Sequence, residues 1–179
     1  GIAGTPDSTW SSVWAEKLIV SDNDFDGGSS GTGLAMQFAP TNTSVDERHR
    51  DAICERNWFH GDIGTPIGSE VCNRMTIRNN LFNTTGGETI WIEGKNATSA
   101  PIADSTYIYN NVVYDNIATG YGFTYIGKTG ARDYPTGTVL RNNLVYAPNA
   151  SSTVLVSTGA AGAYYTVGNN SSNAQIKST

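Results

Sequence analysis

The chain has 179 residues, only 15% of them charged, and a formal net charge of −5. The length suits one domain, and the charge content lies well below the roughly 25% of an ordinary soluble domain. The acidic balance excludes the basic surface that nucleic acid requires, and no apolar run approaches the roughly 20 residues that span a bilayer, so we expect neither partner.

The first segment allows two interpretations. Residues 7–14 read as a short amphipathic helix that caps the fold, with Trp10, Val13 and Trp14 facing inward. Alternatively, residues 1–3 form a strand and residues 5–16 a long turn. The chain begins with Gly1 rather than Met, so we expect a mature, trimmed or excised chain.

One short pattern then recurs six times. It reads apolar residue, any residue, polar turn residue, Asn, any residue, and in all but the last copy a second apolar residue. We interpret each copy as two short strands around a corner, because residues on either side alternate inward and outward. The corner needs a left-handed or bridge conformation, which Asn tolerates. The recurring Asn residues are Asn23, Asn57, Asn80, Asn111, Asn143 and Asn170.

This repeat predicts an asparagine ladder. If each copy is one coil of a solenoid, the six amides stack and bond their neighbours above and below. A β-sandwich is the alternative, but it has no reason to repeat Asn at a fixed offset from an inward aliphatic residue. The expected inward residues are Val20, Cys54, Ile77, Ile108, Leu140 and Val167 before the corner, and Phe25, Phe59, Phe82, Val113 and Val145 after it.

A second set of strands is expected between the corners. It covers residues 34–38, 89–93, 123–126 and 153–156, with a degenerate version near 62–65. Each coil then carries three short strands and three turns, and repeats differ in their loops. We predict an all-β fold in which residues 1–179 form a single parallel β-helix solenoid of about six coils.

The segment Ile77-Arg-Asn-Asn-Leu-Phe82, with its other copies, resembles the right-handed parallel β-helix of the pectate-lyase-like superfamily over nearly the whole chain. This resemblance implies right-handed winding. It also implies one of several functions: polysaccharide lyase, glycoside hydrolase, phage tailspike or non-catalytic surface protein. The chain stops just after its last corner without an evident cap, so we expect a fragment with missing flanking coils or a member of a homo-oligomer.

In the resembling lyases the substrate lies along the sheet that matches the second strand set. Aligning Ile92 with Ile126 places the outward rings of Trp91 and Tyr125 on adjacent coils, where they suit a sugar face. The alternative is that these rings pack under a loop. β-Elimination on a uronic acid also needs a group that neutralises the carboxylate and a base. The candidates are Lys128, Arg132 and His49 as catalytic residues, and Trp91, Glu93, Lys95, Tyr125 and Arg48 as substrate-binding residues.

Other chemistry has fewer candidates. Hydrolysis needs two carboxylates across a cleft, for which Glu93 with Asp62 or Asp133 is the available grouping. No cofactor is expected, although Asp24 and Asp26 could share an outward calcium ion.

Cys54 and Cys72 are 18 residues apart, which is no zinc spacing and leaves a disulfide or two buried thiols open.

Two functions follow. The first is a polysaccharide-active protein, with lyase-like β-elimination on an acidic glycan. The alternative is a non-catalytic glycan-binding, adhesive or structural solenoid, since fold does not imply function. Several Asn-X-Ser/Thr triplets favour an extracellular or secreted protein; they begin at Asn42, Asn83, Asn96, Asn149, Asn169 and Asn170.

Overall fold

The structure is a computed structural model. It describes residues 2–3, 16–28, 33–38, 49–70, 72–84, 87–94, 104–115, 122–128, 135–146, 154–158 and 165–172. Within these ranges the chain forms strands and no helix, so no described helix is long and apolar enough to cross a lipid bilayer. The all-β prediction is confirmed for this part of the chain.

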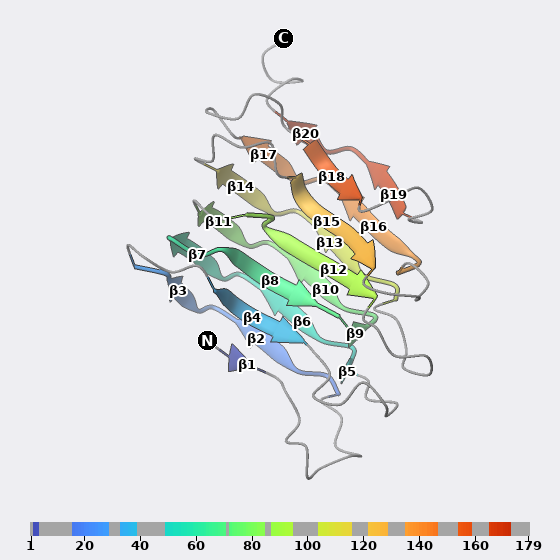
Figure 1. The fold of residues 1–179 in the computed structure, drawn as a ribbon, viewed down its shortest axis with the longest axis horizontal. Helices are drawn as coiled ribbons and strands as arrows, with labels where there is room; N and C mark the ends of the chain where they lie inside the picture. The colour runs from blue at the N-terminus through green and yellow to red at the C-terminus, as the bar shows by residue number, and fades with distance from the viewer. Residues whose placement is uncertain are drawn as a thin grey trace.

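The strands form three sheets of six strands each and one sheet of two (Figure 1). The first sheet contains β1 (Ile2–Ala3), β4 (Leu34–Phe38), β8 (Thr65–Ser69), β12 (Ile90–Gly94), β15 (Gly122–Lys128) and β18 (Val154–Thr158). The second contains β2 (Ile19–Ser21), β6 (Ile53–Glu55), β10 (Thr76–Arg78), β13 (Tyr107–Tyr109), β16 (Thr138–Arg141) and β19 (Tyr165–Gly168). The third contains β3 (Asp24–Asp26), β7 (Trp58–Gly61), β11 (Leu81–Thr84), β14 (Val112–Asp115), β17 (Leu144–Tyr146) and β20 (Ser171–Ser172). The short sheet pairs β5 (His49–Arg50) with β9 (Cys72–Asn73).

The chain visits the three large sheets in a fixed order and then returns to the first sheet one strand further on. Every strand pair in the described ranges is parallel. We call one passage through the three sheets a coil. This all-β arrangement of parallel sheets is compatible with the β-solenoid that the repeat predicted.

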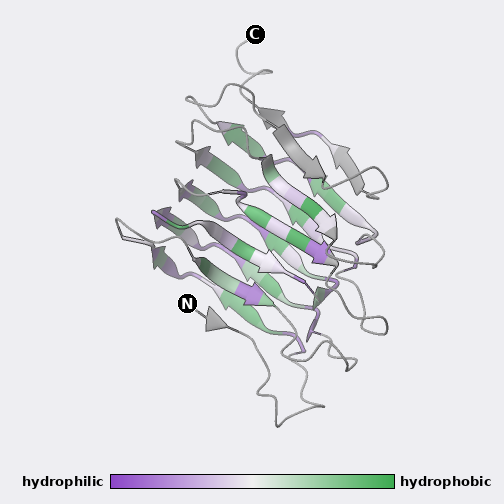
Figure 2. Ribbon diagram, viewed as in Figure 1, coloured by the Kyte–Doolittle hydropathy of each residue, from purple (hydrophilic) through white to green (hydrophobic). Residues whose placement is uncertain are grey.

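Nine of the predicted inward residues belong to the buried core, with Cys54, Ile77, Phe59 and Phe82 at 0% exposure. Phe25, on the first of these coils, is partly buried and packs against that core. The side chain of Val167 lies outside the described part of the structure. Hydrophobic residues recur along the strands of each sheet (Figure 2). The phenyl rings stack from coil to coil, with centroids 4.7 Å apart for Phe25–Phe59 and 4.9 Å for Phe59–Phe82. These distances match the spacing of about 4.8 Å between neighbouring strands.

Each corner between the second and third sheets has two consecutive positions with different roles. The second position carries the ladder Asn, which is buried in Asn57, Asn80 and Asn111. The residue before it adopts the left-handed conformation, as in Arg56 with φ 54° and Asn79 with φ 55°. The conformational demand therefore falls on the residue before the ladder Asn, and the ladder Asn is needed for its hydrogen bonds.

A second series of left-handed corners precedes the second sheet. One residue in each of five successive coils has φ between 55° and 69°, and no two of these residues are of the same type. The sequence shows no recurring pattern at these positions, because a repeated backbone conformation does not require a repeated residue type. The residues are Lys17, Asp51, Arg74, Ser105 and Gly137.

Two strands of the first sheet refine the expected boundaries. The expected degenerate strand near 62–65 is a full strand, β8, that pairs with β4 and β12. Pro66 and Gly68 hid it, since both are depleted in strands. At the start of the chain, β1 pairs with β4, as one of the two interpretations expected. Residues 4–15, which carry the cap-helix alternative, lie outside the described residues.

Candidate functional site

The outer face of the first sheet carries a column of side chains in register. Gln37 of β4 pairs with Gly68 of β8, Gly68 with Trp91 of β12, and Trp91 with Tyr125 of β15. The inward residues on either side of Trp91, Ile90 and Ile92, are fully buried. This alternation places the two aromatic side chains on the outer face, as predicted from the alignment of Ile92 with Ile126.

The two rings contact each other edge to face. Their centroids lie 6.4 Å apart and the planes are inclined by 65°. The Tyr125 ring lies over Gly127, where a Cβ atom would collide with it. Trp91 Nε1 is enclosed and makes no hydrogen bond within the described part of the chain. The pair therefore offers a ligand the surface of its rings. The strand pairing and Gly127 fix the position of that surface.

Two carboxylates lie next to the rings. Glu70 and Glu93 directly follow the Ser69–Ile92 pair of β8 and β12, and they are only 3% and 6% exposed. Gln37 Nε2 donates to Glu70 Oε1 at 3.1 Å. Glu93 was a predicted binding residue, but Glu70 was missed, because β8 was placed several residues too early.

The cationic candidates fall largely outside the described residues. Lys128 ends β15, where it pairs with Gly94. Arg48, Lys95 and Arg132 lie outside the described ranges, so their roles stay predictions.

His49 and Asp62 lie outside the strand positions that form the column with the rings. His49 of β5 is 2% exposed, and its ring meets Phe38 edge to face at 5.6 Å. The imidazole therefore packs against a core side chain. Asp62 precedes the start of β8 and Glu93 lies near the end of β12, so the structure does not bring this pair together. Asp133 lies outside the described residues.

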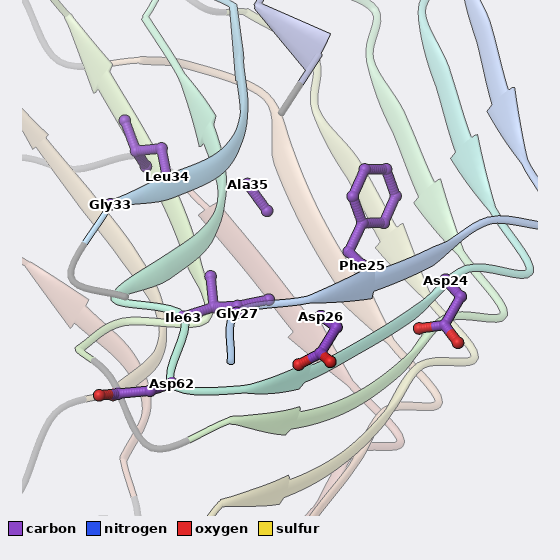
Figure 3. Close-up of a pocket in the computed structure, with 9 residues that line it drawn as sticks. All are labelled: Asp24, Phe25, Asp26, Gly27, Gly33, Leu34, Ala35, Asp62 and Ile63. Atoms are coloured by element: carbon purple, nitrogen blue, oxygen red, sulfur yellow. The ribbon is translucent and has the colours of Figure 1, made fainter. Parts of the chain in front are cut away.

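A hollow of about 360 Å³ at the end of the third sheet contains the proposed calcium ligands, Asp24 and Asp26 (Figure 3). Both point to the outer side of β3, opposite Phe25. Asp24 Oδ1 lies 2.5 Å from His60 Nε2, and Asp26 Oδ1 accepts a bond from the Gly28 N–H at 2.8 Å. Within the described ranges, no three His, Cys, Asp or Glu side chains form a group that could hold a metal ion.

The outer face of the third sheet carries an exposed apolar strip. Trp58, Leu81, Val112 and Leu144 form one column in register, each 39–43% exposed. Beside it, the rings of Tyr114 and Tyr146 lie 5.6 Å apart. This strip was not predicted, although the repeat contains a signal for it: the residue after the ladder Asn is large and apolar in four coils. A solvent-exposed apolar strip is typical of interaction surfaces.

The second sheet and its corners carry the ion pairs of the arginines. Arg78 Nε lies 2.6 Å from Glu55 Oε2, and Arg56 forms two bonds of 2.8 Å with Asp22. Hydrogen bonds from Arg78 and then Arg56 hold the pKa of Glu55 below its ordinary value. A hydrogen bond from Arg74 lowers the pKa of Asp51 in the same way, at the corner that precedes the second sheet. These cations are neutralised within the protein and do not face the first sheet's rings.

Comparison with known proteins adds no relative: no family model, no curated protein and no solved structure matches this chain. The candidate site therefore rests on its own geometry.

Proposed function

We propose that the protein is a polysaccharide-active, right-handed parallel β-helix of the pectate-lyase-like kind, and that its glycan lies along the outer face of the first sheet. Right-handed winding is supported by the parallel strands of each sheet, because crossovers between parallel strands are almost always right-handed. The asparagine ladder and the three-strand coil are the features on which the resemblance rests.

The observation that carries the proposal is the Trp91–Tyr125 pair on adjacent strands. The faces of a pyranose ring are apolar in patches and stack on aromatic side chains. Polar groups beside the rings, here Glu70, Glu93 and Gln37, can accept or donate bonds to sugar hydroxyls. Rings for contact and a few polar groups for orientation are the usual composition of a small-molecule site.

Lyase-like β-elimination on an acidic glycan is the first activity we propose. A base takes the C5 proton of a uronate unit, the C4–O bond breaks, and the leaving oxygen takes up a proton. Lys128 and Arg132 are the proposed base and its partner, and Lys95 and Arg48 the groups that neutralise the substrate carboxylate. Such cations would also offset the two buried glutamates, which otherwise repel an anionic substrate.

Hydrolysis is a second candidate, favoured by Glu70 and Glu93. Neighbouring strands lie about 4.8 Å apart, and the two carboxyl groups of a retaining glycosidase are separated by about 5–5.5 Å. Two carboxylates that directly follow paired positions of neighbouring strands, next to a ring pair, therefore suit the acid and nucleophile of a retaining mechanism.

A product assay separates these activities. The protein is incubated with pectate, alginate and glycosaminoglycans, and with neutral glucans and xylans as matched substrates. Ultraviolet-absorbing unsaturated products from an acidic glycan support elimination. New reducing ends without that absorbance support hydrolysis and contradict elimination.

Binding without either product would make the protein a non-catalytic glycan-binding or adhesive solenoid, which the exposed apolar face of the third sheet favours. Sedimentation as a dimer or trimer would support that alternative further. We also propose an extracellular setting. Asn83 of the triplet Asn83-Thr-Thr is exposed on the third sheet, whereas Asn170 is buried in the ladder and is not a glycosylation acceptor.

A further inference from the structure

A second hollow, of about 390 Å³, lies on the outer face of the second sheet. It is formed by two adjacent strands, β13 and β16, and by the corners that follow them. Its volume falls within the roughly 300–1,000 Å³ of small-molecule sites. Its lining residues are Tyr107, Tyr109, Asn110, Val139, Arg141 and Asn142.

Arg141 is the cation of this hollow, and the strand register leaves it without a counter-charge. In the same outward column, Arg78 is paired to Glu55 of the strand before it. Arg141 instead has Tyr109 on one side and Gly168 on the other. Arg141 forms no ion pair within the described part of the chain. Gly168 has no side chain that could pair with Arg141. Even an added Cβ atom at residue 168 would lie 3.9 Å from Arg141 Cγ, so the space beside Arg141 is open on this side.

Tyr109 presents a directed hydroxyl donor. Its Oη accepts a hydrogen bond from Arg78 Nη1 at 3.0 Å, so the phenolic hydrogen is left to point elsewhere. Arg78 is itself held by Glu55 at 2.6 Å. The orientation of the Tyr109 hydroxyl therefore depends on a fixed chain of contacts along the column.

The rest of the hollow suits a sugar ring. Tyr107 is 41% exposed and pairs with the half-buried Val139, so a ring face and an apolar side chain lie together. Asn110 and Asn142 are exposed at the corners, where each amide offers donors and an acceptor to hydroxyl groups. A carboxylate fits Arg141 best, because the guanidinium fork bonds both carboxylate oxygens.

We propose that this hollow binds the carboxylate-bearing ring of an anionic sugar, with Arg141 pairing to the carboxylate and Tyr107 stacking on the ring. The site lies on a different sheet from Trp91 and Tyr125, and it holds whether or not the first sheet binds a glycan.

The test is an NMR titration of the backbone amides with glucuronate, with glucose as the neutral match and inorganic phosphate as a simple anion. We expect glucuronate to shift the amides of Asn110 and Asn142 at lower concentration than glucose or phosphate. Arg141→Gln should weaken glucuronate binding about tenfold or more, to the level of glucose. Arg141→Lys should fall in between, because it keeps the charge and loses the fork.

Two control variants make the result specific. Arg74→Gln removes an exposed arginine that pairs with Asp51 elsewhere, and it should leave the titration unchanged. Trp91→Ala should leave the shifts of Asn110 and Asn142 unchanged, whatever it does to shifts on the first sheet, and this separates the two sites. Equal binding of glucuronate by the protein and by Arg141→Gln would overturn the proposal. Phosphate binding as strong as glucuronate binding would overturn the sugar assignment.

Discussion

Asn111 Oδ1 accepts two hydrogen bonds from Asn80, one from its backbone N–H at 3.0 Å and one from its Nδ2 at 3.1 Å. Asn57 makes the same two bonds to Asn80, at 3.0 and 3.1 Å. Asn80 Nδ2 also donates to the carbonyl of Cys54 at 3.0 Å. One buried amide therefore satisfies backbone and side-chain groups of three successive coils.

Replacing a central ladder residue should be costly. In Asn80→Ala the buried donors of Asn57 and the carbonyl of Cys54 lose their partner, and each unsatisfied buried group costs about 1–3 kcal/mol. We expect the free energy of unfolding to fall by about 3–5 kcal/mol. Denaturant titration measures it.

Asn23→Ala is the matched control for the ladder. Asn23 is exposed at the end of the column, where its Nδ2 also bonds Ser21 O of its own coil. We expect a loss of less than about 1 kcal/mol. Equal losses for the two variants would contradict the account of the ladder.

The two cysteines should be unreactive in the folded protein. Both thiols are free and buried, and burial raises the pKa of Cys54 and of Cys72 to about 12. At pH 8 only about one thiol in ten thousand is then ionised. A disulfide-exchange reagent should modify neither residue under native conditions and both in denaturant. Rapid native labelling of Cys54 would contradict its burial in the core beside the ladder.

Stability should fall at acid pH. The pKa of Glu55 lies below its ordinary value of 4.5 because Arg78 and Arg56 donate to the carboxylate, and the pKa of Asp22 and of Asp51 is lowered in the same way. The unfolded chain therefore takes up protons before the folded one does as the pH decreases. This stabilisation is complete well above pH 4.5 and is lost below it, down through the lowered folded-state pKa values.

Glu55→Gln tests the acid prediction. The variant should be less stable than the parent at pH 7. The difference should shrink at pH 3, because that pH lies below the ordinary pKa of 4.5 and the unfolded parent chain has taken up the proton there. Unfolding midpoints at the two pH values measure this. A difference that is as large at pH 3 as at pH 7 would contradict the role of Glu55.

Gly127→Ala tests the position of the Tyr125 ring. A methyl group at residue 127 collides with that ring, so the ring must leave its contact with Trp91. We expect the affinity for a bound glycan to fall several-fold, and the near-ultraviolet circular dichroism of the aromatic pair to change. Gly33→Ala is the matched control, since a Cβ there meets nothing within 4 Å. Unchanged affinity in Gly127→Ala would contradict the proposed glycan surface.

The ladder was predictable because a chemical requirement is tied to one residue type. Only a short amide side chain can accept from one coil and donate to the next, so Asn recurs at a fixed offset from Cys54, Ile77 and Ile108. The opposite holds for the corner that contains Lys17, Asp51 and Arg74. There the structure repeats a positive φ angle. Different residues can adopt this angle at modest cost, so the sequence shows no repeated residue type.

The candidate site was predictable only in part, for a similar reason. The adjacency of Trp91 and Tyr125 followed from aligning the isoleucines beside them, and the strand register confirms it. Glu70 could not be placed, because Pro66 and Gly68 hid the strand that positions it. The repeat also contains the apolar column of Trp58, Leu81 and their neighbours. This column was not predicted, because the repeat was interpreted only for its inward residues.

The most direct test of the proposed function is a map of amide chemical shifts in the Arg141→Gln variant titrated with oligogalacturonate, a glycan of the acidic class we propose. This background removes the proposed second-sheet site. We predict that the largest shifts fall on Trp91, Glu93 and Tyr125 of the first sheet. Shifts confined to the apolar face of the third sheet, around Trp58 and Leu81, would contradict the account.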